Sequence, residues 1–149
     1  VTLSPHPLLQ MNFSDTRSIG LRWSGDALVF TGGTGDGPEI SIDGDSSQGP
    51  SPMELLLLSI SGCMAIDLRV ILEKSRVPVE SLEIDATGAR AGDAPKKYES
   101  IQLVCRITGP DEEHESQVQH ALDLSRDKYC SVLHSLNPEI SMDIRVERT

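Results

Sequence analysis

The sequence predicts a single α+β domain, residues 1–149, in which a largely antiparallel sheet packs against a long central helix and a second helical segment. Strand-like alternation of apolar residues occurs on both sides of a long apolar helical pattern that begins near residue 51. A second helical pattern follows residue 110. The length of 149 residues suits one domain. Residues 1–20 contain Pro5 and Pro7 and are expected to form an irregular N-terminal extension.

Three short strands are predicted before the first helix. The stretch "LRWSGDALVF" reads as two strands around a Ser-Gly-Asp turn, and "EISID" (39–43) alternates as a third strand. The glycine-rich stretch "TGGTGDGP" lacks the Lys-Ser/Thr pair of a phosphate-binding loop. It is therefore expected to connect strands, and "GDSSQGPSP" is expected to be a polar linker to the helix.

The first helix has a clear predicted start. Ser51 is the expected N-cap, Pro52 fits the first helical position, and Glu54 completes a capping box. The helix is expected to end near Arg76, because Pro78 disfavours helical backbone at the preceding residue. The apolar run 55–66 is shorter than the roughly 20 residues of a membrane span, which favours a buried helix. It is apolar nearly all round, so a second copy of the chain is expected to help cover it.

In the second half of the chain, the sequence pattern predicts two strands, a helical region and a final strand. The helical region is expected to break near 125–127 into two shorter helices. Two sets each share one face of a strand: Leu82, Ile84 and Ala86; and Ile101, Leu103, Cys105 and Ile107. The residues that follow helical spacing are Val118, Ala121, Leu122, Ser125, Tyr129, Val132 and Leu136. In the final strand, the residues expected to face inward are Ile140, Met142, Ile144 and Val146.

Composition narrows the possible partners and compartments. The net charge is −10 and no basic stripe is present, so nucleic acid is not an expected partner. No signal-peptide pattern opens the sequence and no membrane partner is expected, which favours the cytoplasm. Three widely spaced cysteines do not resemble a secreted disulfide framework and favour free thiols in a reducing compartment.

Each of the three cysteines has a different sequence context. Cys105 shares the inward face of a strand with aliphatic residues, which predicts a structural role. Cys63 follows two small residues on the apolar helix, and both a core role and a reactive role are open for it. Cys130 lies near Arg126 and Lys128, and basic neighbours favour the thiolate form.

Metal and cofactor signals are weak in the sequence. His120 and His134 lie in the second helical region without an accompanying cluster of cysteines or carboxylates. We therefore predict neither a metal site nor a cofactor.

Two stretches together resemble the OsmC/Ohr family of thiol-dependent hydroperoxide reductases. They are "SPMELLLLSISGCMAID" and "LSRDKYCSV", and the resemblance covers roughly residues 20–147. It implies an OsmC-like fold and an intertwined homodimer. It also implies that Cys63 is the peroxidatic thiol, that Cys130 is the resolving thiol, and that a dithiol reductant regenerates both.

The sequence departs from the family pattern at the group that activates the first cysteine. The resemblance implies an arginine oriented by a glutamate ten residues before that cysteine, a position that Met53 occupies here. Glu54 is one residue later, and both a capping role and a catalytic role are open for it. No arginine lies between Ala27 and Pro50, so Arg17 and Arg22 are the arginines that precede the helix.

The expected function is therefore that of a cytoplasmic thiol peroxidase, which reduces organic or fatty-acid hydroperoxides in oxidative stress defence. One alternative is a non-enzymatic module that binds a small hydrophobic ligand in a cleft at the dimer interface. Another is a redox-responsive protein whose disulfide changes dimer packing without turnover.

Overall fold

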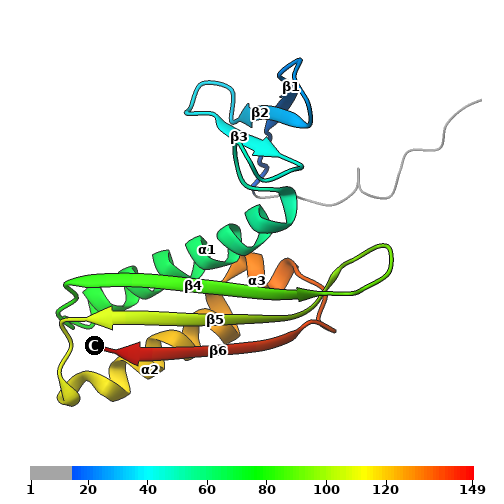
Figure 1. Ribbon diagram of the computed structural model, residues 1–149. Coiled ribbons are helices and arrows are strands. Elements are labelled where there is room, and N and C mark those ends of the chain that lie inside the picture. The colour runs from blue at the N-terminus through cyan, green and yellow to red at the C-terminus, as the bar shows by residue number, and fades with distance from the viewer. Residues whose placement is uncertain (1–14) are drawn as a thin grey trace, which may run out of the picture. The chain divides into compact units, whose positions relative to one another are not determined.

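The computed structural model describes residues 15–149, so most of the predicted irregular N-terminal extension lies outside the described residues. The chain divides into two compact units, Val1–Pro52 and Met53–Thr149 (Figure 1). Both contain β-structure, and the larger one also contains the helices. The α+β class predicted from the sequence is confirmed.

The smaller unit holds a three-stranded antiparallel sheet. Its strands are β1 (Gly20–Trp23), β2 (Val29–Gly33) and β3 (Ile40–Asp43), and β2 lies in the middle. These are the three strands that the alternation predicted. The residue pairs Trp23↔Phe30 and Phe30↔Ile42 fix the register of the sheet.

Asp43 organises the connection between β3 and the first helix. Its carboxylate accepts hydrogen bonds from the backbone N–H groups of Asp45, Ser47 and Gln48 at 2.9, 3.2 and 2.9 Å, and from the Ser47 hydroxyl at 2.8 Å. These donors lower the pKa of Asp43 to about 2, because they favour the ionised form. The predicted polar linker is therefore a loop held by one carboxylate.

The larger unit contains a mixed three-stranded sheet. Its strands are β4 (Ser81–Arg90), β5 (Tyr98–Thr108) and β6 (Ser141–Arg148), and β5 lies in the middle. The pair β4/β5 is antiparallel and the pair β5/β6 is parallel. A parallel pair needs a long crossover, which the helical region between β5 and β6 supplies.

The helices of the larger unit lie on one face of this sheet (Figure 1). The first is α1 (Pro52–Lys74), close to the predicted range. The second helical region breaks where the sequence predicted: α2 (Glu115–Leu124) is followed by a single π-helical segment, Ser125–Tyr129, and then by α3 (Ser131–Ser135). A short 3₁₀ turn, Glu112–His114, precedes α2.

The core of the larger unit forms between α1, α2 and β5. α1 contributes a stripe of residues four positions apart, which places them on one side of the helix. Cys105 is buried there as predicted, and burial raises the pKa of its thiol to about 11. The fully or almost fully buried residues of this core include Ile60, Met64, Leu68 and Leu72; Ile101, Leu103 and Ile107; and Val118, Ala121 and Leu122.

Another side of α1 stays exposed in the single chain. Leu58, Ile66 and Val70 are 58%, 66% and 44% exposed, so the single chain does not cover this side, and its cover by a second copy stays a prediction. By length and composition alone α1 is also apolar enough to cross a membrane, a property that it shares with core helices of globular domains. Here its buried stripe packs into the core of the larger unit.

Tyr98 positions the first turn of α1. Its hydroxyl donates a 2.6 Å hydrogen bond to the Met53 carbonyl oxygen. Its ring lies so close to Gly88 that a Cβ at this position would be 2.3 Å from the ring. Glycine at residue 88 therefore lets the tyrosine bridge β4, β5 and α1.

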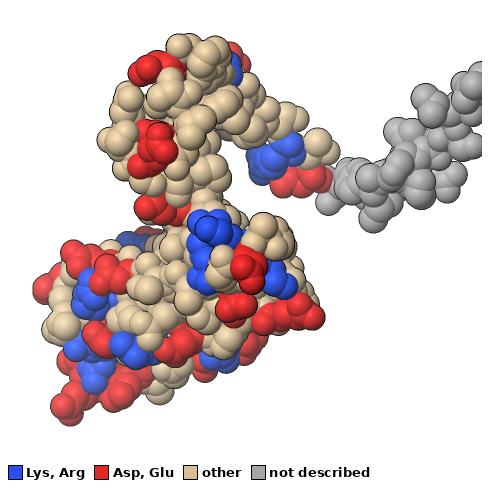
Figure 2. Space-filling view, turned by 45° about the vertical axis from the view of Figure 1, so that its right-hand side comes forward, with Lys and Arg blue, Asp and Glu red and all other residues tan. Residues whose placement is uncertain are grey.

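Charged side chains are spread over the face of the larger unit that Figure 2 shows. On the face seen in Figure 2, Lys and Arg side chains lie among Asp and Glu side chains, and no continuous basic patch forms on that face. Such mixed charge is typical of a solvated surface.

Candidate functional site

Cys63 and Cys130 come together although they lie far apart in the sequence. Their sulfur atoms and a carboxylate oxygen of Asp67 all lie within 4.8 Å of one another. Both thiols are free. The structure therefore places two thiols and one carboxylate in a single cluster, which we call the thiol cluster.

The helical repeat explains how α1 contributes two members of the thiol cluster. Cys63 and Asp67 are four positions apart, so their side chains lie on the same side of the helix, one turn apart. From the other helical region, Ser125 donates a 2.8 Å hydrogen bond to the Asp67 carboxylate. Ser125 is fully buried and is the first residue of the π-helical segment.

The π-helical segment places Cys130 at the thiol cluster. The Cys130 backbone N–H donates to the Ser125 carbonyl oxygen at 2.8 Å, a hydrogen bond that spans five positions as in a π-helical turn. Cys130 then caps α3, and its sulfur accepts a hydrogen bond from the Leu133 N–H at 3.5 Å. π-helical turns are frequent at functional sites.

Cys130 is the more deeply buried of the two thiols. It is fully buried, whereas Cys63 is half-buried. Burial is the main cause that raises the pKa of Cys130 to about 11, and Cys63 and Asp67 raise it further. The hydrogen bond from Leu133 acts in the opposite direction but does not overcome burial.

The prediction that Arg126 and Lys128 favour the thiolate form of Cys130 is wrong, because the pKa of this thiol is raised. Arg126 pairs with Asp123 at 3.2 Å and with Asp127 at 2.7 Å, and Lys128 lies 5.2 Å from the ring centre of Tyr129. Tyr129 itself is 47% exposed. Closeness in sequence did not bring the positive charges to the sulfur, because the side chains at 126 and 128 engage other partners.

A pocket of about 430 Å³ lies beside the thiol cluster and shares Asp67 with it. Its walls come from one side of α1 and from the end of the second helical region. They are largely apolar, and Lys74 adds a positive charge. The residues that line it are Asp67, Val70, Ile71, Lys74, Ser75, Leu124 and Tyr129.

Glu54 is not a member of the thiol cluster. It lies in the first turn of α1 and lines a separate hollow of about 500 Å³ between α1 and β4. Its charge helps to raise the pKa of Tyr98, although burial is the larger cause. The sequence left a capping role and a catalytic role open for Glu54, and its location does not bring it to the thiols.

The two candidate arginines belong to the smaller unit. The Arg22 guanidinium donates two hydrogen bonds to the Glu39 carboxylate, at 2.7 and 2.6 Å, and this pairing lowers the pKa of Glu39. Arg17 pairs with Asp15 at 3.2 Å. Within this unit both arginines therefore already have a carboxylate partner.

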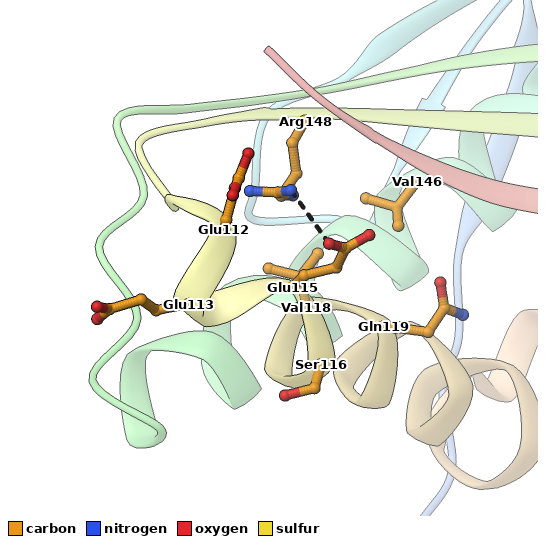
Figure 3. Close-up of a pocket in the computed structure, with 8 residues that line it drawn as sticks. All are labelled: Glu112, Glu113, Glu115, Ser116, Val118, Gln119, Val146 and Arg148. Atoms are coloured by element: carbon orange, nitrogen blue, oxygen red, sulfur yellow. Dashed lines mark hydrogen bonds and ion pairs between the residues drawn. The ribbon is translucent and has the colours of Figure 1, made fainter.

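A further hollow, of about 590 Å³, lies where α2 begins, beside β6 (Figure 3). Glu112, Glu113 and Glu115 give it an acidic wall, and Arg148 pairs with Glu115 at 3.3 Å. No cysteine is among the residues that line it.

Sequence reasoning identified both cysteines of the thiol cluster and missed Asp67 and Ser125. Asp67 lies four residues after Cys63 on a predicted helix, and this spacing could have indicated that the two side chains are neighbours. No local pattern marks Ser125, because its role depends on a contact between segments 58 positions apart.

Comparison with known proteins identifies the family. The OsmC-like protein family matches residues 44–145 of the chain. Protein YhfA of Escherichia coli strain K12 is 38% identical over 118 residues, which cover 78% of this chain and 87% of that protein.

Solved structures agree with this assignment. A hypothetical protein from Aquifex aeolicus VF5 has a TM-score of 0.79 and 32% identity, covering 91% of this chain and 97% of that one. The organic hydroperoxide resistance protein OhrB of Bacillus subtilis shares the fold, with a TM-score of 0.59, 15% identity, and coverage of 89% and 98%. The chain belongs to the OsmC-like protein family.

Proposed function

We propose that the chain is a two-cysteine thiol peroxidase that reduces organic or fatty-acid hydroperoxides. The observation that best supports this is the thiol cluster, in which the free thiols of Cys63 and Cys130 approach within 4.8 Å. A disulfide needs a sulfur–sulfur distance of about 2.05 Å, so the two sulfurs would have to move closer by at most about 2.8 Å. The chain also shares its fold with the organic hydroperoxide resistance protein OhrB of Bacillus subtilis.

Exposure supports a division of roles between the two thiols. Half-buried Cys63 is accessible to a substrate, so we assign it the peroxidatic role. Fully buried Cys130, with its raised pKa, stays protonated and unreactive toward outside reagents until a partner forms beside it. We therefore assign it the resolving role.

The proposed reaction has three steps. The Cys63 thiolate attacks the distal hydroperoxide oxygen, the O–O bond breaks, and the alkoxide takes a proton and leaves as the alcohol, which makes Cys63 a sulfenic acid. Cys130 then attacks the Cys63 sulfur, and its proton leaves with the hydroxyl as water while the disulfide forms. A dithiol reductant, such as a lipoyl-type dithiol, reduces the disulfide to two thiols and becomes a disulfide itself.

The pocket of about 430 Å³ supports an organic substrate. Val70, Ile71 and Leu124 give it apolar walls next to Asp67 of the thiol cluster. Burial of an alkyl group against such walls is favourable by about 25 cal/mol for each Å² removed from water. Lys74 would pair with the carboxylate of a fatty-acid hydroperoxide.

We further propose that the protein acts as a homodimer. The exposed side chains of Leu58, Ile66 and Val70 are apolar, and a second copy would cover them. A Cβ at Gly62 would meet nothing within 4 Å, so the small residue beside Cys63 leaves room for a close approach. Free thiols suit a reducing compartment, and we place the protein in the cytoplasm.

The test is consumption of cumene hydroperoxide with a dihydrolipoyl-type dithiol. Wild type should consume the hydroperoxide catalytically, and the rate of Cys63→Ser should fall to the background rate. Cys130→Ser should turn over more slowly than wild type, because its Cys63 sulfenic acid has no resolving thiol beside it. Cys105→Ala is the matched control and should keep its activity, because that thiol lies outside the thiol cluster. Full turnover by Cys63→Ser would disprove the mechanism.

Binding of a small hydrophobic ligand is the second candidate function. The same pocket supports it, since its size and walls suit a compact apolar molecule. A co-purified ligand seen by native mass spectrometry, together with a Cys63 that does not react with hydroperoxide, would favour binding over catalysis.

A further inference from the structure

The thiol cluster joins three donor atoms that metals use as ligands. Two are the sulfur atoms of Cys63 and Cys130, and the third is a carboxylate oxygen of Asp67. No local sequence motif marks this group, because Cys130 lies 67 residues after Cys63. His120 and His134 are both exposed and are not members of the cluster.

We propose that the reduced thiol cluster is a Zn²⁺ site, with Cys63, Asp67 and Cys130 as its protein ligands. The fourth tetrahedral position is left for water or a small ligand, as in zinc sites with three protein ligands. The proposal does not depend on peroxidase activity, because metal binding needs only the reduced thiols.

The geometry of the thiol cluster suits zinc after a small contraction. Zn–S bonds of about 2.3 Å and Zn–O bonds of about 2.0–2.2 Å place tetrahedral ligand atoms roughly 3.5–3.8 Å apart. The donor atoms here lie within 4.8 Å of one another. Side-chain movements of about 1 Å would therefore close the coordination shell.

Neighbouring groups already orient two of the proposed ligands. Ser125 donates to the Asp67 carboxylate at 2.8 Å, and the Leu133 N–H donates to the Cys130 sulfur at 3.5 Å. Hydrogen bonds of this kind hold ligands in place and are typical of protein metal sites. Asp67 also lines the neighbouring pocket of about 430 Å³, which offers an entry path.

The donor set selects the metal. Two thiolates disfavour Mg²⁺ and Ca²⁺, which prefer shells made only of oxygen ligands. Cu(I) prefers soft sulfur ligands, so the Asp67 carboxylate favours Zn²⁺ over it. When Zn²⁺ binds, each thiol loses its proton to the solvent and the cysteines stay reduced.

Bound zinc would exclude the redox chemistry of the same sulfurs. A thiolate held by Zn²⁺ cannot form a disulfide without releasing the metal, and a disulfide offers no thiolate to bind it. Zinc occupancy and oxidation by hydroperoxide are therefore mutually exclusive states of the thiol cluster.

The test is a competition titration of the metal-free, fully reduced full chain with a chromophoric zinc chelator. Wild type should bind one Zn²⁺ per chain. Cys63→Ser, Cys130→Ser and Asp67→Asn should each weaken binding by at least about tenfold. Asp67→Asn keeps an oxygen that can accept the Ser125 hydrogen bond, so it removes the charge with little change of shape. Cys105→Ala and Asp143→Asn are the matched controls and should bind as wild type does.

A second measurement uses Co²⁺ as a spectroscopic probe of the reduced chain. Thiolate-to-cobalt charge-transfer absorption should appear in wild type and vanish after oxidation to the disulfide. Zinc binding unchanged in Cys130→Ser or Asp67→Asn, or retained after oxidation, would overturn the proposal. Zinc binding without peroxidase turnover would refute the proposed function alone, whereas turnover of the metal-free chain without zinc binding would refute this inference alone.

Discussion

Ser125 donates a 2.8 Å hydrogen bond to Asp67. This contact connects two segments: the π-helical segment that precedes Cys130, and the turn of α1 that follows Cys63. Ser125 is fully buried and Asp67 is half-buried, so the hydrogen bond is partly shielded from water. The relative position of the two thiols thus depends on a contact that involves neither of them.

Replacing Ser125 by alanine should loosen the approach of the two thiols. The loss of a partly buried hydrogen bond to a carboxylate should lower the free energy of unfolding by about 1–2 kcal/mol. It should also slow disulfide formation between Cys63 and Cys130 after one equivalent of hydroperoxide. Urea unfolding and rapid-quench thiol counting measure the two effects. Ser135→Ala is the control, since that exposed hydroxyl bonds only to the Ser131 carbonyl of its own helix. Equal disulfide rates in both variants would contradict the role of the contact.

Replacing Lys74 by methionine should raise KM for substrates that carry a carboxylate and leave KM for uncharged substrates almost unchanged. Lys74 lines the pocket beside the thiol cluster, so its loss should raise KM for a fatty-acid hydroperoxide by about tenfold, which corresponds to one charge-assisted contact. KM for cumene hydroperoxide should hardly change, because that substrate carries no carboxylate. Steady-state kinetics with both substrates tests this, and Lys97→Met, outside the pocket, is the control. Equal rises in both KM values would mean that Lys74 supports the pocket structurally.

Burial of Cys105 should make the protein less stable at alkaline pH. The pKa of this thiol is about 11 in the folded chain against an ordinary value of 9.0. Between about pH 9 and 11 the folded state therefore holds a proton that the unfolded state has lost, so stability falls as pH rises. Cys105→Val removes this titration and should reduce the alkaline loss by up to about 2–3 kcal/mol.

Denaturant unfolding of wild type and Cys105→Val near pH 8 and near pH 10.5 measures this difference. The comparison isolates Cys105, because every other titrating group is common to both proteins. A difference between the two proteins that is the same at both pH values would show that folding does not raise the pKa of this thiol.

A charge on the exposed side of α1 should break the proposed dimer. Ile66 is 66% exposed in the single chain, so Ile66→Asp should leave the fold intact while it places a carboxylate in the proposed interface. Sedimentation velocity should show a dimer for wild type and a monomer for the variant. Gln117→Asp, on the exposed side of α2, is the control and should remain dimeric. A monomeric wild type would show that the exposed apolar residues serve another purpose.

Much of the fold could be predicted because it depends on local patterns. The apolar spacing of α1 and the alternation of β4, β5 and β6 predicted these elements. The break in the second helical region was predicted at Ser125–Asp127, where polar and charged residues interrupt the apolar spacing. The parallel pairing of β5 with β6 and the separation of the chain into two compact units depend on long-range contacts, which no local pattern encodes.

The candidate site was predictable only in part, for the same physical reason. Both cysteines stand in motifs that carry the family resemblance, so they could be named in advance. The raised pKa of Cys130 could not be predicted, because it arises mainly from burial in the folded chain, where Arg126 and Lys128 engage other partners. Asp67 and Ser125 meet across 58 positions and gain their roles only in the folded chain.

Mapping the disulfide after stoichiometric oxidation tests the central claim most directly. Reduced wild-type protein is treated with one equivalent of an organic hydroperoxide, alkylated, digested and analysed by mass spectrometry. The account predicts a Cys63–Cys130 disulfide with Cys105 alkylated after unfolding, and a Cys63 sulfenic acid trapped by dimedone in Cys130→Ser. Unmodified Cys63 and Cys130 after complete consumption of the peroxide, or a disulfide that includes Cys105, would contradict it.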